Sequence, residues 1–314
     1  MNVEHIDIYQ SVTNRIINAL EAGTPPWVRP WTGESDPNPI NADSLRAYRG
    51  INWVTLQIEA QLGGYNRNVW MTYRQAAARG AQVRNGARGC PVVFWKLRKI
   101  NAAAETEPWP CTDDIERRII PLIRYSTVFN VAQIDGLPPE YSASPETVPT
   151  WTSKEAAETI INKSGADIRH GGFRAFYQPT QDFVQLPSPN AFADASGYYA
   201  TALHELCHWS GHPTRLNRQL GSRFGAQAYA MEELIAEMGS AFLCAHSRIN
   251  GLLQHASYVQ NWLQVLRSDK RAVFVASTKA QNAADYLLDR ASGKPAVGVA
   301  ASAMPSLRRE AETA

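Results

Sequence analysis

Residues 204–208 read HELCH, two histidines four positions apart with a glutamate directly after the first. Side chains four positions apart on a helix project from the same face, so the imidazoles of His204 and His208 can reach one metal ion. Glu205 would then lie beside the open coordination position, where its carboxylate can take a proton from water and pass it to a leaving amine. The spacing predicts a helical zinc clamp with Glu205 as general base, although HExxH also arises by chance.

A third ligand elsewhere in the chain would distinguish a true metal site from a chance HExxH match. Candidates lie on a second predicted helix at residues 229–247, YAMEELIAEMGSAFLCAHS. Glu233 and Glu237 share a face of this helix one turn apart, beside an apolar stripe. A buried carboxylate pair is costly unless a cation neutralises it. We therefore expect Glu233 to be the third ligand and Glu237 to hold a histidine by its other ring nitrogen. Glu232 points about 100° away around the helix, so we do not expect it to be a ligand.

Two neighbours of the clamp have less specific roles. His212 follows Gly211, which we expect to end the helix. Its side chain could approach the site and steady a substrate, but we expect it to be exposed. Cys207 points off the ligand face and is expected to be a small core residue. A metal site can be structural as well as catalytic, so these residues leave open whether the protein cleaves anything.

An earlier stretch of the chain is basic and aromatic. Between Arg46 and Lys99 there are ten arginines and lysines and one acid, Glu59, so the segment carries +9. Arginines provide cationic contacts for phosphates and aromatic rings provide faces for unpaired bases, which favours single-stranded DNA as a partner. The residues that we expect to bind DNA are Trp27, Trp31, Arg46, Arg49, Trp53, Arg67, Trp70, Arg84, Arg88 and Lys96. The alternative is that the tryptophans fill a core and the arginines form a solvated face.

Composition limits the remaining possibilities. The chain of 314 residues is 44% hydrophobic and 19% charged, and its net charge of +2 hides the basic segment. The four cysteines form no C-x-x-C pair, which favours a reducing compartment over a disulfide scaffold. The N-terminus lacks the apolar region of a signal peptide, and no apolar run approaches the roughly 18 residues of a membrane span. We expect a cytoplasmic protein without membrane contact.

The Pro-, Ser- and Glu-rich stretch 136–151 is typical of a linker. It predicts a DNA-binding domain at 1–135, a metal-binding domain at 152–290 and a disordered tail at 291–314. The first domain should combine two or three helices with a small, mainly antiparallel sheet, including a capping box at Thr72 and a hairpin turn at Asn85 and Gly86. In the second domain, residues 173–189 predict another hairpin, along which a peptide substrate can lie. The fold class is therefore α+β.

Segments in both halves of the sequence resemble a known family. HELCHWSGHPTRLNR (204–218) followed by YAMEELIAEMGSAFL (229–243) resembles the metallopeptidase-like domain of mobile-element polyvalent proteins. The segments GTPPWVRPW, YRGINWVTL, NVWMTYRQAAARGAQVRNG and TVFNVAQIDGLP resemble the single-stranded-DNA-binding domain of ArdC-type antirestriction proteins, which also occurs at the N-terminus of plasmid conjugative primases. The match runs over nearly the whole chain, in the same order.

The resemblance implies a protein that binds single-stranded DNA and protects incoming plasmid DNA from type I restriction. It also implies a zincin-like domain with one divalent ion, which we expect to be Zn²⁺, held by His204, His208 and Glu233. The alternative function is a zinc metalloprotease that cleaves a host protein, such as a type I restriction component, with DNA binding for targeting. A third possibility, a component of the primase or transfer machinery, is disfavoured because the chain has no recognisable polymerase motif.

Overall fold

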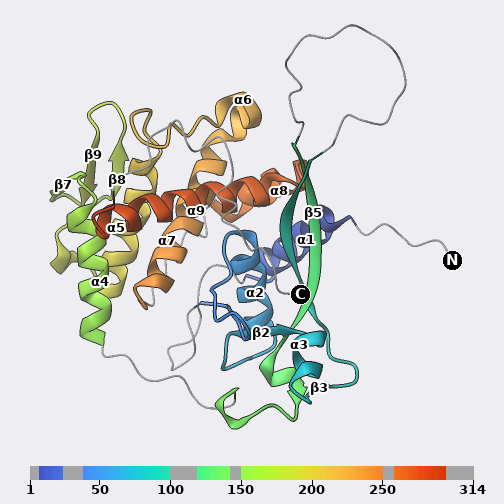
Figure 1. Cartoon of the computed structure of the whole chain (residues 1–314). Coiled ribbons are helices and arrows are strands. Elements are labelled where there is room, and N and C mark those ends of the chain that lie inside the picture. Colours follow the sequence, from blue (N-terminus) through green and yellow to red (C-terminus); the bar gives the residue numbers. More distant parts are fainter. Residues whose placement is uncertain (1–6, 24–37, 100–118, 142–149, 250–257, 295–314) are drawn as a thin grey trace, which may run out of the picture.

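The computed structural model describes residues 7–23, 38–99, 119–141, 150–249 and 258–294, so Trp27 and Trp31 lie outside the described residues. The elements of the first half are α1 (Ile8–Glu21), β1 (Ile40–Asn41), α2 (Ile51–Leu62), β2 (Val69–Thr72), α3 (Tyr73–Ala78), β3 (Gln82–Val83), β4 (Cys90–Lys99), β5 (Ile119–Asn130) and β6 (Ile134–Asp135). Those of the second half are α4 (Thr150–Lys163), β7 (Asp167–His170), β8 (Phe176–Gln178), β9 (Phe183–Leu186), α5 (Ala195–Ser210), α6 (Gly221–Phe224), α7 (Ala228–His246), α8 (Val259–Ser268) and α9 (Ala272–Ala291). The predicted α+β class is confirmed (Figure 1).

The first half is built on a four-stranded sheet in the order β1-β2-β5-β4, in which only β1 and β2 run parallel. Strands β4 and β5 pair over ten positions and form the long twisted ribbon in Figure 1. Helix α2 packs on one face of this sheet through Leu56 and Ala60, against Trp70 of β2 and Val92 of β4. The predicted capping box of α3 is present, because the Thr72 hydroxyl and the Gln75 side chain each bond the other's backbone N–H.

The Asn85–Gly86 pair does not close a hairpin, and our expectation there was wrong. Strand β3 before the turn pairs with β6, whereas β4 after it joins the four-stranded sheet. Val83 and Ile134 lie opposite each other in this short pairing and are both buried in a small separate core. Because Val83 and Ile134 are buried against each other, β3 pairs with β6 and not with β4, the next strand along the chain.

Strand β4 is an edge of its sheet, and one residue of α2 covers that edge. The Asn52 side-chain amide donates to the Val93 carbonyl at 2.7 Å and accepts from the Val93 N–H at 2.8 Å. A side-chain amide thus takes the place of a neighbouring strand at this position of the edge.

The second half has a three-stranded sheet in the order β7-β9-β8, with a helical layer formed chiefly by α5, α7 and α9. The predicted hairpin at 173–189 is confirmed as β8 and β9, which pair antiparallel from Phe176↔Gln185. Helix α5 begins at the Asp194 cap, whose carboxylate accepts from the Gly197 N–H at 2.8 Å, and it ends at Gly211. These caps place the HELCH segment in the last two turns of a regular helix.

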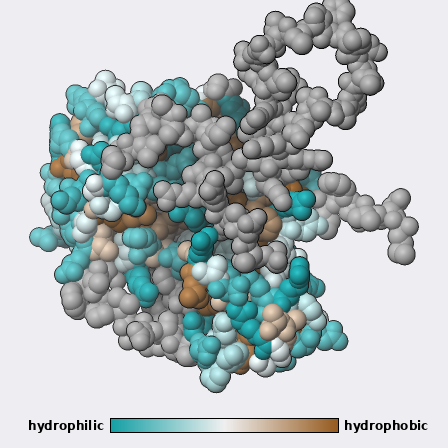
Figure 2. Space-filling view, in the orientation of Figure 1, coloured by the Kyte–Doolittle hydropathy of each residue, from teal (hydrophilic) through white to brown (hydrophobic). Residues whose placement is uncertain are grey.

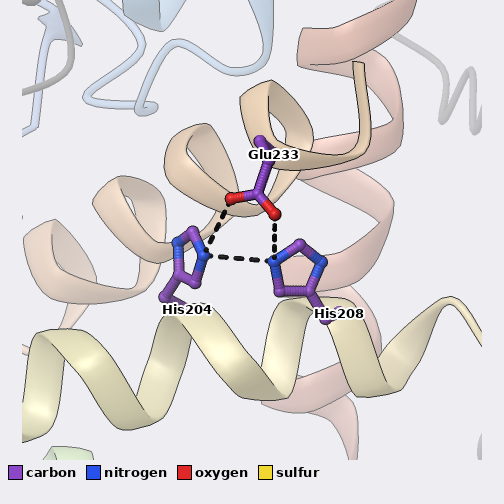
Figure 3. A group of neighbouring side chains, drawn as sticks. All are labelled: His204, His208 and Glu233. Atoms are coloured by element: carbon purple, nitrogen blue, oxygen red, sulfur yellow. Dashed lines mark hydrogen bonds and ion pairs between the residues drawn. The ribbon is translucent and has the colours of Figure 1, made fainter. Parts of the chain in front are cut away.

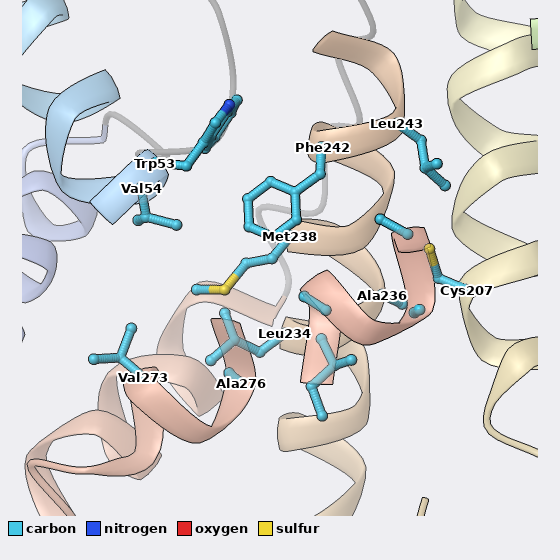
Figure 4. Packing of buried hydrophobic residues seen from close by; sticks show 14 of the residues in the cluster. Trp53, Val54, Cys207, Leu234, Ala236, Met238, Phe242, Leu243, Val273 and Ala276 are labelled. Atoms are coloured by element: carbon cyan, nitrogen blue, oxygen red, sulfur yellow. The ribbon is translucent and has the colours of Figure 1, made fainter. Parts of the chain in front are cut away.

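One hydrophobic core joins the two halves across the segment 136–151. Trp53 and Val54 of α2 contact the core beside Phe242 and Met238 of α7, and the Trp53 and Phe242 rings meet edge to face at 5.0 Å (Figure 4). Helix α1 packs on α8, and α2 also packs on α9. The first half is therefore held against the second by buried apolar side chains.

None of the helices in the described ranges is long and apolar enough to cross a bilayer. On the face shown in Figure 2 the described residues are mainly hydrophilic, with small scattered hydrophobic patches.

Candidate metal centre

The structure brings His204, His208 and Glu233 together. His204 and His208 lie one turn apart on α5 and point at α7, which supplies Glu233 (Figure 3). The Nε2 atoms of the two histidines are 3.1 Å apart, and each lies 3.6 Å from one of the two carboxylate oxygens of Glu233. The three groups offer ligand atoms that all lie within 4.8 Å of one another. Three donors thus converge on one small volume between the two helices.

This donor set fits a tetrahedral divalent ion. Zinc binds histidine nitrogen at about 2.0–2.1 Å, so two imidazole nitrogens on one tetrahedral ion are separated by about 3.3 Å. The observed 3.1 Å between the two Nε2 atoms is close to that separation. A tetrahedral ion held by these two imidazoles and this carboxylate would keep a fourth position for water or substrate, as catalytic rather than structural zinc sites do.

A pocket of about 730 Å³ opens directly onto the three candidate ligands. Glu205 lines it and is itself buried, so its carboxylate lies in the same cavity as the ligand atoms without being one of them. Four aromatic residues also line the pocket, namely Phe176, Tyr177, Tyr229 and Tyr258. His212 also lines the pocket and is half-buried, so it is less exposed than we expected. Cys207 is fully buried, as predicted.

A carboxylate from α7, that of Glu232, lies against the other ring nitrogen of His208. Glu232 Oε1 lies 3.2 Å from Nδ1 of His208, and Glu232 is in turn paired with the buried guanidinium of Arg218. Glu237 is buried one turn beyond Glu233 on α7, and its role beside the ligands stays a prediction. Glu232 is one residue before Glu233 on α7, so its side chain points about 100° away around the helix. That direction takes its carboxylate to Nδ1 of His208, on the other side of the ring from Nε2.

The charges around the site shift the pKa values of its groups in opposite directions. Burial lowers the pKa of His208, but the hydrogen bond and charge of Glu232, with the charges of Glu205 and Glu233, outweigh burial and raise it. Burial raises the pKa of Glu232, but the charge and hydrogen bonds of Arg218 outweigh burial and lower it to about 2. Glu232 is therefore ionised at neutral pH.

The residues expected to bind DNA divide into buried and exposed groups. Trp53 and Trp70 are only 5% and 1% exposed, so they are core residues and offer no face to a base, which corrects our prediction. Arg46 and Arg88 are exposed, whereas Arg67 is half-buried and donates to the Glu140 carbonyl. Arg49 and Arg84 are exposed and ion-paired with Asp285 and Asp135. Lys96 belongs to β4, but its side chain lies outside the described residues.

The β4–β5 ribbon presents aromatic and basic side chains that sequence reasoning did not select. Phe94 is 46% exposed and lies directly across from the exposed Arg124, and the next residue, Tyr125, is 50% exposed. Arg124 lies beyond the basic segment at residues 46–99, so the charge count over that segment did not include it. Only the pairing register of β4 with β5 shows that it stands beside Phe94.

Two protein families match this chain. Residues 6–129 match the N-terminal domain of the anti-restriction factor ArdC, and residues 155–279 match a zincin-like metallopeptidase family. Two crystal structures of the antirestriction ArdC protein from the R388 plasmid are similar to nearly the whole chain. The metal-free structure has a TM-score of 0.76 and 41% identity, covering 92% of this chain and 100% of that one. The Mn(II)-bound structure has a TM-score of 0.73 and 42% identity, covering 91% and 99%.

Two relatives of known sequence extend the comparison. Protein y4eC of Sinorhizobium fredii is 44% identical over 90% of this chain and 91% of its own length. The DNA primase TraC of Escherichia coli is 41% identical over 89% of this chain, but this match covers only 27% of the primase.

Proposed function

Because the chain belongs to the ArdC family of antirestriction proteins, we propose that it binds single-stranded DNA and protects incoming plasmid DNA from type I restriction. The protected molecule would be DNA entering by conjugation, and the protein would act in the cytoplasm. DNA binding would be without strong sequence preference, because stacking and phosphate contacts tolerate any base.

The single observation that carries this proposal is the cross-strand pair of Phe94 and Arg124. Residues directly opposite on an antiparallel ladder have side chains on the same face, with Cβ atoms about 4.5–5.5 Å apart. An exposed ring and an exposed guanidinium at this spacing match a base and its adjoining phosphate. Tyr125, on the opposite face of the ribbon, offers a second exposed ring.

The test measures binding of a fluorescent oligothymidine by anisotropy. Replacing Phe94 by Ala should weaken binding about 5- to 150-fold, the equivalent of about 1–3 kcal/mol per stacked base. Phe173 is 99% exposed on the loop before β8, so Phe173→Ala is the matched control and should bind as tightly as the unaltered protein. Equal affinities for the two variants would show that the ribbon does not carry the DNA.

We also propose that His204 and His208, through Nε2, and Glu233 hold one divalent ion, namely Zn²⁺. A divalent ion in that position supplies Lewis acidity to a carbonyl group. The Mn(II)-bound form of the R388 protein supports the divalent ion in this proposal, and the choice of Zn²⁺ rests on the donor set of two imidazoles and one carboxylate. Zinc titration of the dialysed protein, followed by metal analysis, should give one equivalent per chain, and two equivalents or none would contradict it.

A second candidate function is cleavage of a host protein, such as a type I restriction component. Glu205 lines the pocket as a buried carboxylate and can accept a proton from water and return it to a leaving amine. Strand β8 is an edge of its sheet, and Phe176 and Tyr177 from it line the pocket, so an extended peptide can pair with it there.

Incubation with a peptide library, with and without a chelator, tests this activity. Chelator-sensitive cleavage that is absent from the Glu205→Gln variant would support a peptidase. No cleavage by the zinc-loaded protein of any library peptide or of purified restriction subunits would exclude it.

A further inference from the structure

Two buried arginines in the loop after α5 are attached to different parts of the site. Arg215 stacks on Trp209, with 3.9 Å from its guanidinium carbon to the ring centroid, and pairs with Asp182 in the β8–β9 turn. Arg218, three residues later, pairs with Glu232 on α7. Their side chains are only 8% and 3% exposed. The same short loop therefore fastens the hairpin on one side and the metal-binding helix on the other.

Arg218 fixes the position of the Glu232 carboxylate. Its Nε donates to Glu232 Oε2 at 2.8 Å and its Nη2 donates to Oε1, so the pairing is bidentate. Nη2 also donates to the Cys207 carbonyl at 2.8 Å, which ties the guanidinium to α5. A bidentate pair held at both ends leaves the carboxylate little rotational freedom.

The fixed carboxylate in turn sets the orientation of a ligand ring. Glu232 Oε1 lies 3.2 Å from Nδ1 of His208, on the opposite side of the ring from Nε2. A carboxylate at Nδ1 favours the tautomer with its proton on Nδ1, which leaves the lone pair of Nε2 for an ion. Nε2 of His208 is the atom that faces Glu233 and His204.

Gly211 leaves the space that Arg218 occupies. A Cβ atom at this position would lie 2.6 Å from Nη2 and 2.7 Å from Cζ of Arg218. The backbone of Gly211 has φ −76°, which any residue can adopt, so the absence of a side chain matters here for space alone. Any larger residue would push the guanidinium from its place against α5.

We propose that Arg218 is a positioning residue of the metal centre, which acts through Glu232 to orient His208 and thereby sets the affinity for a divalent ion. This inference rests on the proposed metal site and adds a residue to it that touches no ligand directly. Loss of a group that orients a metal ligand typically costs about 10–100-fold in metal affinity.

The test compares Arg218→Met with Arg215→Met, since both remove a buried arginine from the same loop. Zn²⁺ affinity is measured by competition with a chelating dye, and the thermal stability of each metal-free protein is measured alongside. Both variants should lose stability, but only Arg218→Met should bind Zn²⁺ about 10–100-fold more weakly. Equal Zn²⁺ affinities in the two variants would overturn the inference, because Arg218 would then be merely structural.

Glu232→Ala and the double variant Arg218→Met/Glu232→Ala complete a cycle. If Arg218 acts through Glu232, the double variant should bind Zn²⁺ no more weakly than Glu232→Ala alone, whereas additive losses would refute the relay. Should Arg218→Met fail to fold, Gly211→Ala displaces the same guanidinium and should weaken Zn²⁺ binding, and unchanged affinity there would contradict the inference. Absence of Zn²⁺ binding by the unaltered protein would instead defeat the proposed metal site itself.

Discussion

Replacing Phe242 by Ala should destabilise both halves of the protein at once. The Phe242 ring is 7% exposed and lies between the two halves, edge to face with Trp53 at 5.0 Å. Removing a buried phenylalanine ring typically costs about 3–5 kcal/mol, as lost transfer energy plus the cavity that remains. Native domains are stable by only about 5–15 kcal/mol, so this variant should stay folded but unfold at a much lower denaturant concentration.

Denaturant unfolding followed by circular dichroism, with hydrogen exchange resolved by peptide, measures this effect. Because the core is continuous, peptides from α2 and from α7 should lose protection by the same amount. Leu62→Ala, at the end of α2, is the control, since Leu62 is 69% exposed and its loss should change stability by less than about 0.5 kcal/mol. The reasoning fails if protection falls only in α7 and its neighbours while α2 keeps its own.

The shared core also affects how the proposed DNA binding of the first half should be studied. A fragment that ends near Pro139 would expose the side chains of α1 and α2 that pack on α7, α8 and α9. Point variants of the whole chain therefore test DNA binding more cleanly than truncation does.

Three further outcomes can be checked. His208→Ala should lose Zn²⁺ on dialysis, because one of three ligand atoms is gone, and a full equivalent retained in metal analysis would contradict the assignment. If DNA binding is responsible for antirestriction, Glu205→Gln should keep it in a conjugation assay. If proteolysis is responsible, loss of the base should lower the cleavage rate about 100- to 10,000-fold, and protection should disappear. Reversing the charge at Arg84 and Arg88 should weaken single-stranded-DNA binding. The slope of log affinity against log salt concentration should fall in magnitude by about 0.7 for each phosphate that the protein no longer neutralises. An unchanged slope would mean that these arginines only face solvent.

The three candidate ligands could be grouped from the sequence because their geometry is mostly local. A helix alone places His204 and His208 on one face, and acidic residues on an apolar helix single out Glu233. The pairing of Glu232 with Arg218 has no such local cause, since it depends on the path of the loop between α5 and α7. Local spacing predicts ligands, whereas the groups that orient them depend on tertiary structure.

The aromatic residues of the first half were harder to assign. A tryptophan suits a core and a stacking platform equally well, so composition does not separate the two. Two features do point to burial: Trp53 lies in a helix that is apolar around most of its circumference, and Trp70 lies between Val69 and Met71 in a strand without polar alternation. The register that sets Phe94 beside Arg124 depends on a partner strand distant in the sequence, which no short window contains.

The amide of Asn52 on the edge of β4 has a consequence for the protein at high concentration. An uncovered strand edge is a template to which a second molecule can add its own strand, the first step towards fibrils or amorphous precipitate. At Val93 both backbone groups are already taken by Asn52, so an incoming strand would have to displace α2 before it could pair there. The adjacent helix thus blocks strand addition near the middle of the length of β4.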